Sequence, residues 1–323
     1  MSDTGSVGGA DLRGLTCGID VGGTKIAGAV VDVEGTVVAE HRVVSPAADA
    51  DAVEDAIARL VLELAARHEL TAVGIGAAGY VDAGRAVVMF APNIAWRDED
   101  LRHEIQARVQ LPVIVENDAN AAAWGEFAFG AAADVDDMLM VTVGTGVGGG
   151  IVHNGSLFRG GFGAAAEIGH LRVVPGGRQC GCGNLGCLEQ YASGSALVKE
   201  TRAQAMTPEA AALLERAGGD PAAIDGPMIT AAAADGDPFA MAQVAELARW
   251  LGEAIASLAA VLDPGSVVIG GGVSEAGDLL LDPVRAAFLE QLTGRGHRPV
   301  PDIRTASLGN RAGVIGAADL ARH

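Results

Sequence analysis

The chain has very little lysine and no run of basic residues. Its 323 residues include 22 Lys and Arg against 41 Asp and Glu, which gives a formal net charge of −19, and its only lysines are Lys25 and Lys199. Such an acidic surface repels phosphate backbones and anionic lipid head groups. We therefore expect neither nucleic acid nor a membrane among the partners of this protein.

Secretory and membrane-spanning segments are also lacking. The longest stretch without a charged residue, 138–158, contains six glycines, which argues against a spanning helix. Residues 1–14 have neither a basic start nor an apolar core, so they are expected to form a flexible leader and not a signal peptide. The composition predicts a globular, cytoplasmic protein that is long enough for two domains.

Cysteine is scarce, yet three of the four cysteines lie within eight residues of one another in HLRVVPGGRQCGCGNLGCLEQ (170–190). Cys180 and Cys182 are too close in sequence to bond each other, and a Cys182–Cys187 disulfide would leave Cys180 unpaired. A reducing cytoplasm disfavours disulfides as well. With His170 the three thiolates make a Cys₃His set, as in closed tetrahedral zinc sites. Three buried free thiols remain the alternative, and the fourth cysteine, Cys17, is expected to be a small core residue.

The pattern of apolar residues predicts two α/β lobes. Glycine-broken apolar runs predict three strands within residues 15–44, and a helix follows over 49–68. The next elements are strands at TAVGIGA and LPVIVEN with a helix at EDLRHEIQARV between them, and then a helix over 119–129. The second half begins with a strand–turn–strand unit, MLMVTVGTGVGGGIV. It continues with a helix from Asp237 as N-cap to about Leu262, a strand at SVVIGGGVS and a closing helix at RAGVIGAADLARH.

Two segments match the dinucleotide pattern G-x-G-x-x-G, beginning at Gly74 and at Gly144. That site requires the third glycine to open a helix whose N-terminus meets the pyrophosphate. Strand-like sequences, YVDAGRAVV and GIVHNG, follow instead. We therefore do not expect a Rossmann site.

A different glycine turn is better suited to phosphate. The segment Asp20-Val-Gly-Gly-Thr-Lys25 ends the first strand in a turn that offers backbone N–H groups, a hydroxyl and a lysine, with Asp20 placed to meet Mg²⁺. Gly144-Thr145-Gly146 forms a second, similar loop. An ordinary hairpin turn is the alternative interpretation of the first loop.

Polar residues at two other points suit a ligand rich in hydroxyl groups. Asn117 and Asp118 lie where a strand meets a helix, so Asp118 could act as a general base or could simply cap the helix. A metal-pinned cysteine loop would also present Glu167, His170 and Glu189 to such a ligand.

Taken together, these segments resemble the ROK family of bacterial repressors, open reading frames and sugar kinases, and the resemblance is close to its zinc-containing glucokinases. It covers the chain from about Leu15 to the end. VTVGTGVGGGIVHNGSLFRGGFGAAAEIGH is similar to the family signature, and CGCGNLGCLEQYASG to its zinc loop. The resemblance implies a two-lobed, actin-like, hexokinase-type fold around a cleft. The expected small lobe comprises residues 15–120 and 309–323, and the large lobe comprises residues 121–308 with the zinc loop at 170–187.

The resemblance further implies ATP-dependent phosphorylation of glucose at its 6-hydroxyl, with Mg²⁺ and a structural Zn²⁺. Asp118 would be the catalytic base. The sugar would be held by Asn93, Asn117, Asp118, Glu167, His170 and Glu189. The nucleotide phosphates would meet Asp20, Gly22, Gly23, Thr24, Lys25, Gly144, Thr145, Gly146, Gly271 and Gly272. Zinc would be bound by His170, Cys180, Cys182 and Cys187.

The chain departs from the family pattern at one position, where Ala166 replaces the glycine that usually precedes the glutamate of the signature; the added methyl group is expected to narrow the sugar pocket slightly. Mannose, fructose, N-acetylmannosamine and N-acetylglucosamine are alternative substrates, and polyphosphate is an alternative donor. A sugar-responsive regulator is another alternative, but only about 14 residues precede the first strand, too few for a DNA-binding module. A homodimer or homotetramer is expected.

Overall fold

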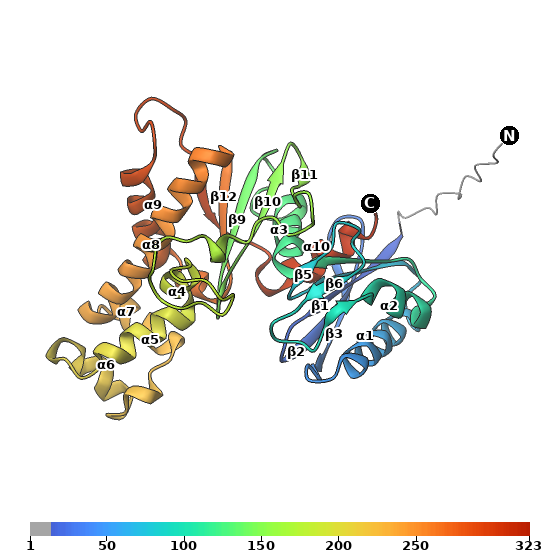
Figure 1. Cartoon of the computed structure of the whole chain (residues 1–323), viewed down its shortest axis with the longest axis horizontal. Helices are drawn as coiled ribbons and strands as arrows, with labels where there is room; N and C mark the ends of the chain where they lie inside the picture. Colours follow the sequence, from blue (N-terminus) through green and yellow to red (C-terminus); the bar gives the residue numbers. More distant parts are fainter. Residues whose placement is uncertain (1–13) are drawn as a thin grey trace. The chain divides into compact units, whose positions relative to one another are not determined.

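A computed structural model describes residues 14–323, so the predicted leader lies, except for Gly14, outside the described residues. The chain divides into two compact units (Figure 1). The first contains residues up to Phe129 together with Arg159–Ala165 and Arg311–His323, and the second contains Gly130–Phe158 and Ala166–Asn310. The expected lobe boundary at residue 120 falls inside a helix of the first unit, and the excursion 159–165 was not expected.

The first unit is built on a five-stranded sheet in the order β3-β2-β1-β4-β8. Strands β1, β2 and β3 are antiparallel neighbours, whereas β4 and β8 continue the sheet parallel to β1. The three consecutive strands predicted from the sequence are thereby confirmed. The strands are β1 (Leu15–Val21), β2 (Lys25–Val31), β3 (Val37–Val44), β4 (Leu70–Ala77) and β8 (Val113–Asn117).

Helices cover both faces of this sheet (Figure 1), with α1 and α2 on one face and α3 and α10 on the other. Helix α1 begins where the Asp49 carboxylate accepts the Ala52 N–H, and it buries an apolar stripe that includes Ile57 and Leu60. The helices are α1 (Ala50–Ala65), α2 (Leu101–Val109), α3 (Asp118–Phe129) and α10 (Ala312–Leu320).

Helix α10 packs unusually close to the sheet because two facing positions lack side chains. A Cβ atom at Gly18 would lie 1.8 Å from the carbonyl oxygen of Val314, and one at Gly74 would lie 1.7 Å from that of Ala317. The first glycine pattern is therefore explained by packing of a helix on a sheet. The chain continues after the first pattern as β5, and the second pattern runs into β10, so neither pattern opens a helix, as predicted.

A small three-stranded sheet follows β4 in the first unit. It consists of β5 (Tyr80–Val81), β6 (Val88–Phe90) and β7 (Arg97–Glu99), which pair antiparallel in that order. The loop between β6 and β7 is fixed by Ile94 and Trp96, whose side chains are buried.

The second unit repeats the plan of the first, with a five-stranded sheet in the order β11-β10-β9-β12-β13. An antiparallel hairpin, β9–β10, is extended by parallel strands β12 and β13. This repetition confirms the expected actin-like class of fold. The strands are β9 (Met138–Val143), β10 (Val147–His153), β11 (Ser156–Leu157), β12 (Ser266–Gly270) and β13 (Asp302–Thr305).

The rest of the second unit is mainly helical. Helix α8 runs from Pro238 to Leu262 with Asp237 accepting the Ala240 N–H, so its predicted bounds and cap are confirmed. The helices of the second unit are α4 (Glu189–Ala192), α5 (Gly194–Gln204), α6 (Ala211–Arg216), α7 (Gly226–Ala234), α8 and α9 (Asp278–Gln291). Short 3₁₀ turns in the chain are η1 (Ile168–His170), η2 (Pro208–Ala210), η3 (Pro221–Ala223), η4 (Gly272–Ala276) and η5 (Gly309–Arg311).

Each unit buries its own apolar core. Cys17 belongs to that of the first unit and has no exposed surface, as predicted. Within residues 14–323, none of the helices combines the length and the apolar character that crossing a lipid bilayer requires.

Candidate active site

The turn between β1 and β2 presents the predicted phosphate loop. The Gly22 N–H donates to the Lys25 carbonyl oxygen over 3.0 Å, and the side chains of Thr24 and Lys25 are exposed. Asp20 lies at the end of β1, where burial raises the pKa of its carboxyl and the nearby Lys25 partly offsets that effect. A bound cation would favour the ionised form of this carboxyl.

Asn93 lies beside this turn. A Cβ atom at Gly23 would be 3.1 Å from both the Cβ and the carbonyl oxygen of Asn93. The exposed Asn93 side chain sits on the loop anchored by Ile94 and Trp96, and Arg97 donates from Nη1 to the Ala91 carbonyl over 2.7 Å. The first unit thus holds Asn93 next to the turn that carries Lys25.

Asn117 and Asp118 lie where β8 passes into α3. The Asn117 side chain caps the helix, since its Oδ1 accepts the Asn120 N–H over 3.0 Å while its Nδ2 donates to the Gly79 carbonyl over 3.1 Å. Asp118 Oδ1 accepts the Ala119 N–H over 2.9 Å. The amide of Asn117 is held in one orientation, and the carboxylate of Asp118 stands at the first position of the helix.

In the second unit the turn between β9 and β10 carries the other predicted glycine loop. The Gly144 N–H donates to the Gly146 carbonyl, and the Gly144 carbonyl accepts the Gly194 N–H at the start of α5. Glu189 Oε2 accepts the Val147 N–H over 3.1 Å. Glu189, predicted as a sugar contact, therefore also braces this turn.

Glu167, His170 and Glu189 lie near one another. His170 Nε2 lies 4.0 Å from Glu167 Oε2. Burial raises the pKa of the Glu167 carboxyl, His170 partly offsets this, and the negative charge of Glu189 raises it further. The arrangement supplies closely spaced hydrogen-bond acceptors and one imidazole that faces them, which suits a ligand with several hydroxyl groups.

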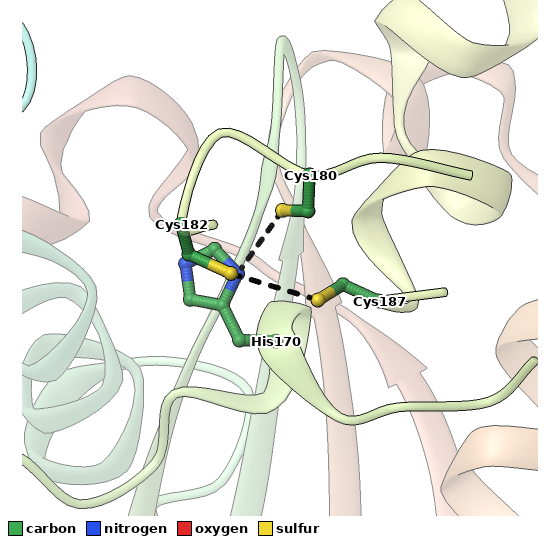
Figure 2. Close-up of side chains that lie close together, drawn as sticks. All are labelled: His170, Cys180, Cys182 and Cys187. Carbon is green, nitrogen blue, oxygen red and sulfur yellow. Dashed lines mark hydrogen bonds between the residues drawn. The ribbon is translucent and has the colours of Figure 1, made fainter. Parts of the chain in front are cut away.

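The cysteine loop gathers its side chains around one point (Figure 2). The ligand atoms of His170, Cys180, Cys182 and Cys187 all lie within 4.8 Å of one another. His170 Nδ1 is 3.6 Å from Cys180 Sγ, and Cys182 Sγ is 3.7 Å from Cys187 Sγ. Because Nδ1 faces the sulfurs, Nε2 is left to face Glu167.

These separations fit a tetrahedral zinc site. Zinc–sulfur bonds of about 2.3 Å place neighbouring ligand atoms about 3.7 Å apart at the corners of a tetrahedron. Burial raises the pKa of the Cys187 thiol to about 12, so this side chain would be neutral without a metal to favour its thiolate. The alternative of three inert thiols leaves their convergence with an imidazole unexplained.

Backbone contacts shape the loop before any metal is considered. Cys180 N–H donates to the Asn184 carbonyl, and Gly186 N–H donates to the Arg178 carbonyl. Gly186 has φ +83°, and a Cβ atom there would lie 1.6 Å from the Val174 carbonyl oxygen, so only glycine fits. The Tyr191 hydroxyl accepts the Arg178 N–H over 2.9 Å, which ties the loop to α4, the helix that carries Glu189.

A pocket of about 1030 Å³ lies within the second unit. Gly144, Thr145 and Gly272, three of the predicted phosphate contacts, line it, and helices α5 and α7 supply much of the wall. Gly271 precedes Gly272 in the chain, and a Cβ atom there would lie 2.5 Å from the carbonyl oxygen of Val143, the residue before Gly144. The wall is mostly apolar, as in pockets for flat aromatic ligands.

Sequence reasoning missed the walls of this pocket. Lys199 and Arg202 on α5 line it, and Thr230 and Ala231 line it from α7. The scarcity of lysine was the one available signal, since Lys199 is one of only two lysines in the chain. Sequence reasoning also missed Arg159, whose Nε lies 2.7 Å from Oε2 of the buried Glu116.

Ala166 has a backbone conformation that explains why the resembling family usually has glycine here. Its φ is +67°, in the left-handed region that costs an L-residue about 1 kcal/mol. We predict that Ala166→Gly raises the free energy of unfolding by up to about 1 kcal/mol, part of the gain being lost to the entropy of glycine. Calorimetric melting should show a midpoint about 2–4 °C higher for each kcal/mol gained.

The control is Ala164→Gly, two residues earlier, where the alanine is exposed and φ is not positive. That change should leave the midpoint unchanged or lower it. Equal losses of stability in both variants would contradict the interpretation that backbone conformation explains the preference for glycine at position 166.

Comparison with known proteins extends over nearly the whole chain. The model of the ROK family matches residues 16–323. A glucokinase from Streptomyces coelicolor is 52% identical over 311 residues, which are 96% of this chain and 98% of that protein.

Solved structures agree. The crystal structure of a ROK family glucokinase from Streptomyces griseus, in complex with glucose and AMPPNP, is 52% identical with a TM-score of 0.87, covering 96% of this chain and 99% of that one. A ROK hexokinase from Thermus thermophilus is 35% identical with a TM-score of 0.78, covering 95% and 97%.

Proposed function

The chain belongs to the ROK family, and on that premise we propose that it is an ATP-dependent glucokinase, which transfers the γ-phosphoryl group of ATP to the 6-hydroxyl of glucose. The observation that carries the proposal is the near full-length similarity to glucokinases, one of which was crystallised with glucose and a nucleotide analogue. The residues expected for sugar and phosphate binding are supported by the groupings found within each unit.

The proposed sugar contacts are all polar side chains. Asn93, Asn117 and Asp118 belong to the first unit, and Glu167, His170 and Glu189 belong to the second. Carboxylates accept hydrogen bonds from sugar hydroxyls, while the asparagine amides and the Nε2 side of His170 can donate them. This set can fix the orientation of a hexose without contributing covalent chemistry.

Asp118 is the proposed general base. Phosphoryl transfer depends chiefly on positioning and on neutralising charge, so the protein has to orient the attacking hydroxyl and accept its proton. The Asp118 carboxylate is set at the start of α3, beside the constrained amide of Asn117. In this mechanism the proton of the 6-hydroxyl passes to Asp118 as the oxygen attacks the γ-phosphorus, and the bond from that phosphorus to the β–γ bridging oxygen breaks, which releases ADP.

ATP is the proposed donor. Backbone N–H groups of the turns at 20–25 and 144–146 would contact the phosphates, and the apolar pocket of the second unit would hold the adenosine. Asp20 is the proposed contact for Mg²⁺, which when bound neutralises phosphate charge. The half-buried Asp20 carboxyl, close to Lys25, fits that use.

Zinc is proposed to be structural, bound by His170, Cys180, Cys182 and Cys187. Four protein ligands leave no position for a substrate. Zinc at His170 Nδ1 would fix the imidazole so that Nε2 points toward Glu167 and the sugar.

The test is a coupled assay of the purified protein against glucose, mannose, fructose, N-acetylmannosamine and N-acetylglucosamine, each with ATP and with polyphosphate. We expect the highest kcat/KM for glucose with ATP. A higher kcat/KM for another sugar would change the proposed substrate, but the protein would still be a sugar kinase. Failure to phosphorylate any of them would refute the proposal.

The nucleotide pocket gives a separate prediction. Ala231→Trp places a large ring in the pocket from an exposed position on α7. Because the ring would occupy the space proposed for adenosine, KM for ATP should rise about tenfold or more, while KM for glucose stays within about twofold. Steady-state kinetics with each substrate varied in turn provide the measurement.

Its matched control is Ala203→Trp, an exposed alanine on α5 that does not line the pocket. That variant should have the kinetics of the unmodified enzyme. An unchanged KM for ATP in Ala231→Trp would place the nucleotide elsewhere.

We also propose that the protein is a cytoplasmic homodimer or homotetramer. Light scattering coupled to gel filtration tests the assembly, and a mass equal to one chain would contradict it.

A further inference from the structure

Glu116 is a fully buried carboxylate between two guanidinium groups. Its side chain has no exposed surface, and its Oε2 lies 2.7 Å from Arg159 Nε and 3.2 Å from Arg85 Nε. All three residues belong to the first unit. Removing one partner of a buried ion pair leaves the other charge buried without compensation, which is strongly destabilising.

The other oxygen of the same carboxylate is engaged by the proposed active-site turn. Glu116 Oε1 accepts the Asn117 N–H over 2.9 Å and Asn120 Nδ2 over 3.1 Å. One carboxylate therefore joins the two arginines to the turn that presents Asn117 and Asp118.

Arg159 is held on its remaining sides. Its Nη1 donates to the Ala83 carbonyl over 2.9 Å and its Nη2 to the Asp82 carbonyl over 2.8 Å. The Asp82 carboxylate in turn closes its own loop by accepting the N–H groups of Gly84, Ala86 and Val87.

The loop also constrains Arg85. It has φ +54°, a conformation that persists only where surrounding contacts enforce it, and its carbonyl accepts the Val115 N–H from β8. The charges balance, with Glu116 and Asp82 against Arg85 and Arg159.

Arg159 also begins an excursion of the chain. The chain leaves the second unit after Phe158, runs through the first unit over Arg159–Ala165, and returns to the second unit at Ala166, immediately before Glu167. The guanidinium that pairs with Glu116 is therefore the first anchor of the segment that leads into a proposed sugar contact.

We propose that Glu116, Arg159 and Arg85 form a positioning clamp. The clamp sets the turn that carries Asn117 and Asp118, and it fastens to that turn the segment that leads to Glu167. The inference rests on the proposed function, because Asp118 and Glu167 matter in this way only if the enzyme phosphorylates a sugar. The three clamp residues are proposed as positioning residues that act through the turn and not as contacts to the sugar.

The experiment is a double-mutant cycle on the full-length protein with Arg159→Met, Glu116→Gln and the double variant. Glu116→Gln retains an acceptor for Asn117 but turns a donor toward the two arginines. Since small displacements at a reacting centre cost up to about 100-fold, each single change should lower kcat for glucose about 10- to 100-fold. KM for ATP should stay within about twofold. The double variant should be no worse than the more damaging single one, since both break the same clamp.

The matched control is Arg322→Met. Arg322 is another nearly buried arginine of the first unit that pairs with a carboxylate, Asp319, and donates to the Val31 and Asp32 carbonyls. The Arg322→Met variant should lower the melting midpoint as much as Arg159→Met does, but its kcat should be unchanged. Arg159→Lys keeps the positive charge but lacks the guanidinium group with its several N–H donors, so it should give an intermediate kcat. If Arg159→Met does not fold, Arg159→Lys takes its place in the cycle, with Arg322→Lys as its control.

Three outcomes would overturn the clamp. The first is a kcat within about twofold of the unmodified enzyme in folded Arg159 and Glu116 variants. The second is a double variant whose loss of kcat equals the product of the two single losses. The third is a loss of kcat in the Arg322 control that equals the loss in Arg159→Met. An unmodified enzyme that phosphorylates no sugar would instead refute the proposed function, and this inference with it.

Discussion

Asp118→Asn is expected to lower kcat for glucose phosphorylation by about 10²–10⁴-fold, the usual contribution of a general base. The Oδ1 of asparagine can still accept the Ala119 N–H, as that of Asp118 does now, so the first turn of α3 should keep its shape. An amide does not accept the hydroxyl proton, and the chemical step alone should suffer. KM for glucose should change by no more than a few-fold.

Kinetics should be combined with calorimetric titration of glucose, because binding without turnover separates loss of the base from loss of the site. Asp100→Asn is the control. Asp100 also accepts an N–H, that of His103, at the start of a helix in the same unit, so Asp100→Asn tests the loss of a negative charge at a helix start that keeps its cap. A kcat for Asp118→Asn within about tenfold of the unmodified enzyme would remove Asp118 from the mechanism.

Cys187→Ser is expected to abolish stoichiometric zinc and to lower the melting midpoint by about 10 °C or more, because loss of a metal ligand belongs to the most damaging class of substitutions. Cys187 has no exposed surface, and the next residue, Leu188, donates its N–H to the Leu171 carbonyl beside His170. Releasing the metal therefore loosens the segment that carries the proposed sugar contacts, and kcat should fall with the zinc content. Acidification should also release zinc, since protons compete for the thiolates.

Elemental analysis and melting curves should be measured on the same preparation. We expect about one zinc per chain in the unmodified protein. The control is Cys17→Ala, which removes a buried thiol from the core of the first unit and should leave zinc and activity in place. Freshly purified, active enzyme without zinc would contradict the proposal that the protein contains a structural zinc ion.

The regular elements could be predicted because their signals are local. Helix α8 has Asp237 as a cap, proline in the first turn and apolar residues every three or four positions, so both of its ends were readable. The C-terminal end of α3 could also be predicted from the sequence, but the sequence did not show that α3 belongs to the first unit. That membership depends on packing against α10, a helix nearly two hundred residues later in the chain.

The candidate metal centre was predictable for the same reason. Cys180, Cys182 and Cys187 lie within one turn-rich segment, and His170 is only ten residues before Cys180, so short-range geometry brings the four ligands together. The Ala166 position was recognised from the family pattern, but the reason for the usual glycine is a backbone angle and was visible only in the structure.

Residue type and short-range spacing thus determined which elements form and which four side chains converge in the candidate metal centre. The tertiary structure alone decided that Glu116 receives a guanidinium from Arg159, 43 positions away in the chain, and that Lys199 faces a pocket. The physical reason is that burial of a charge and enclosure of a pocket depend on which distant surfaces meet. No periodicity or motif within a single segment contains that information.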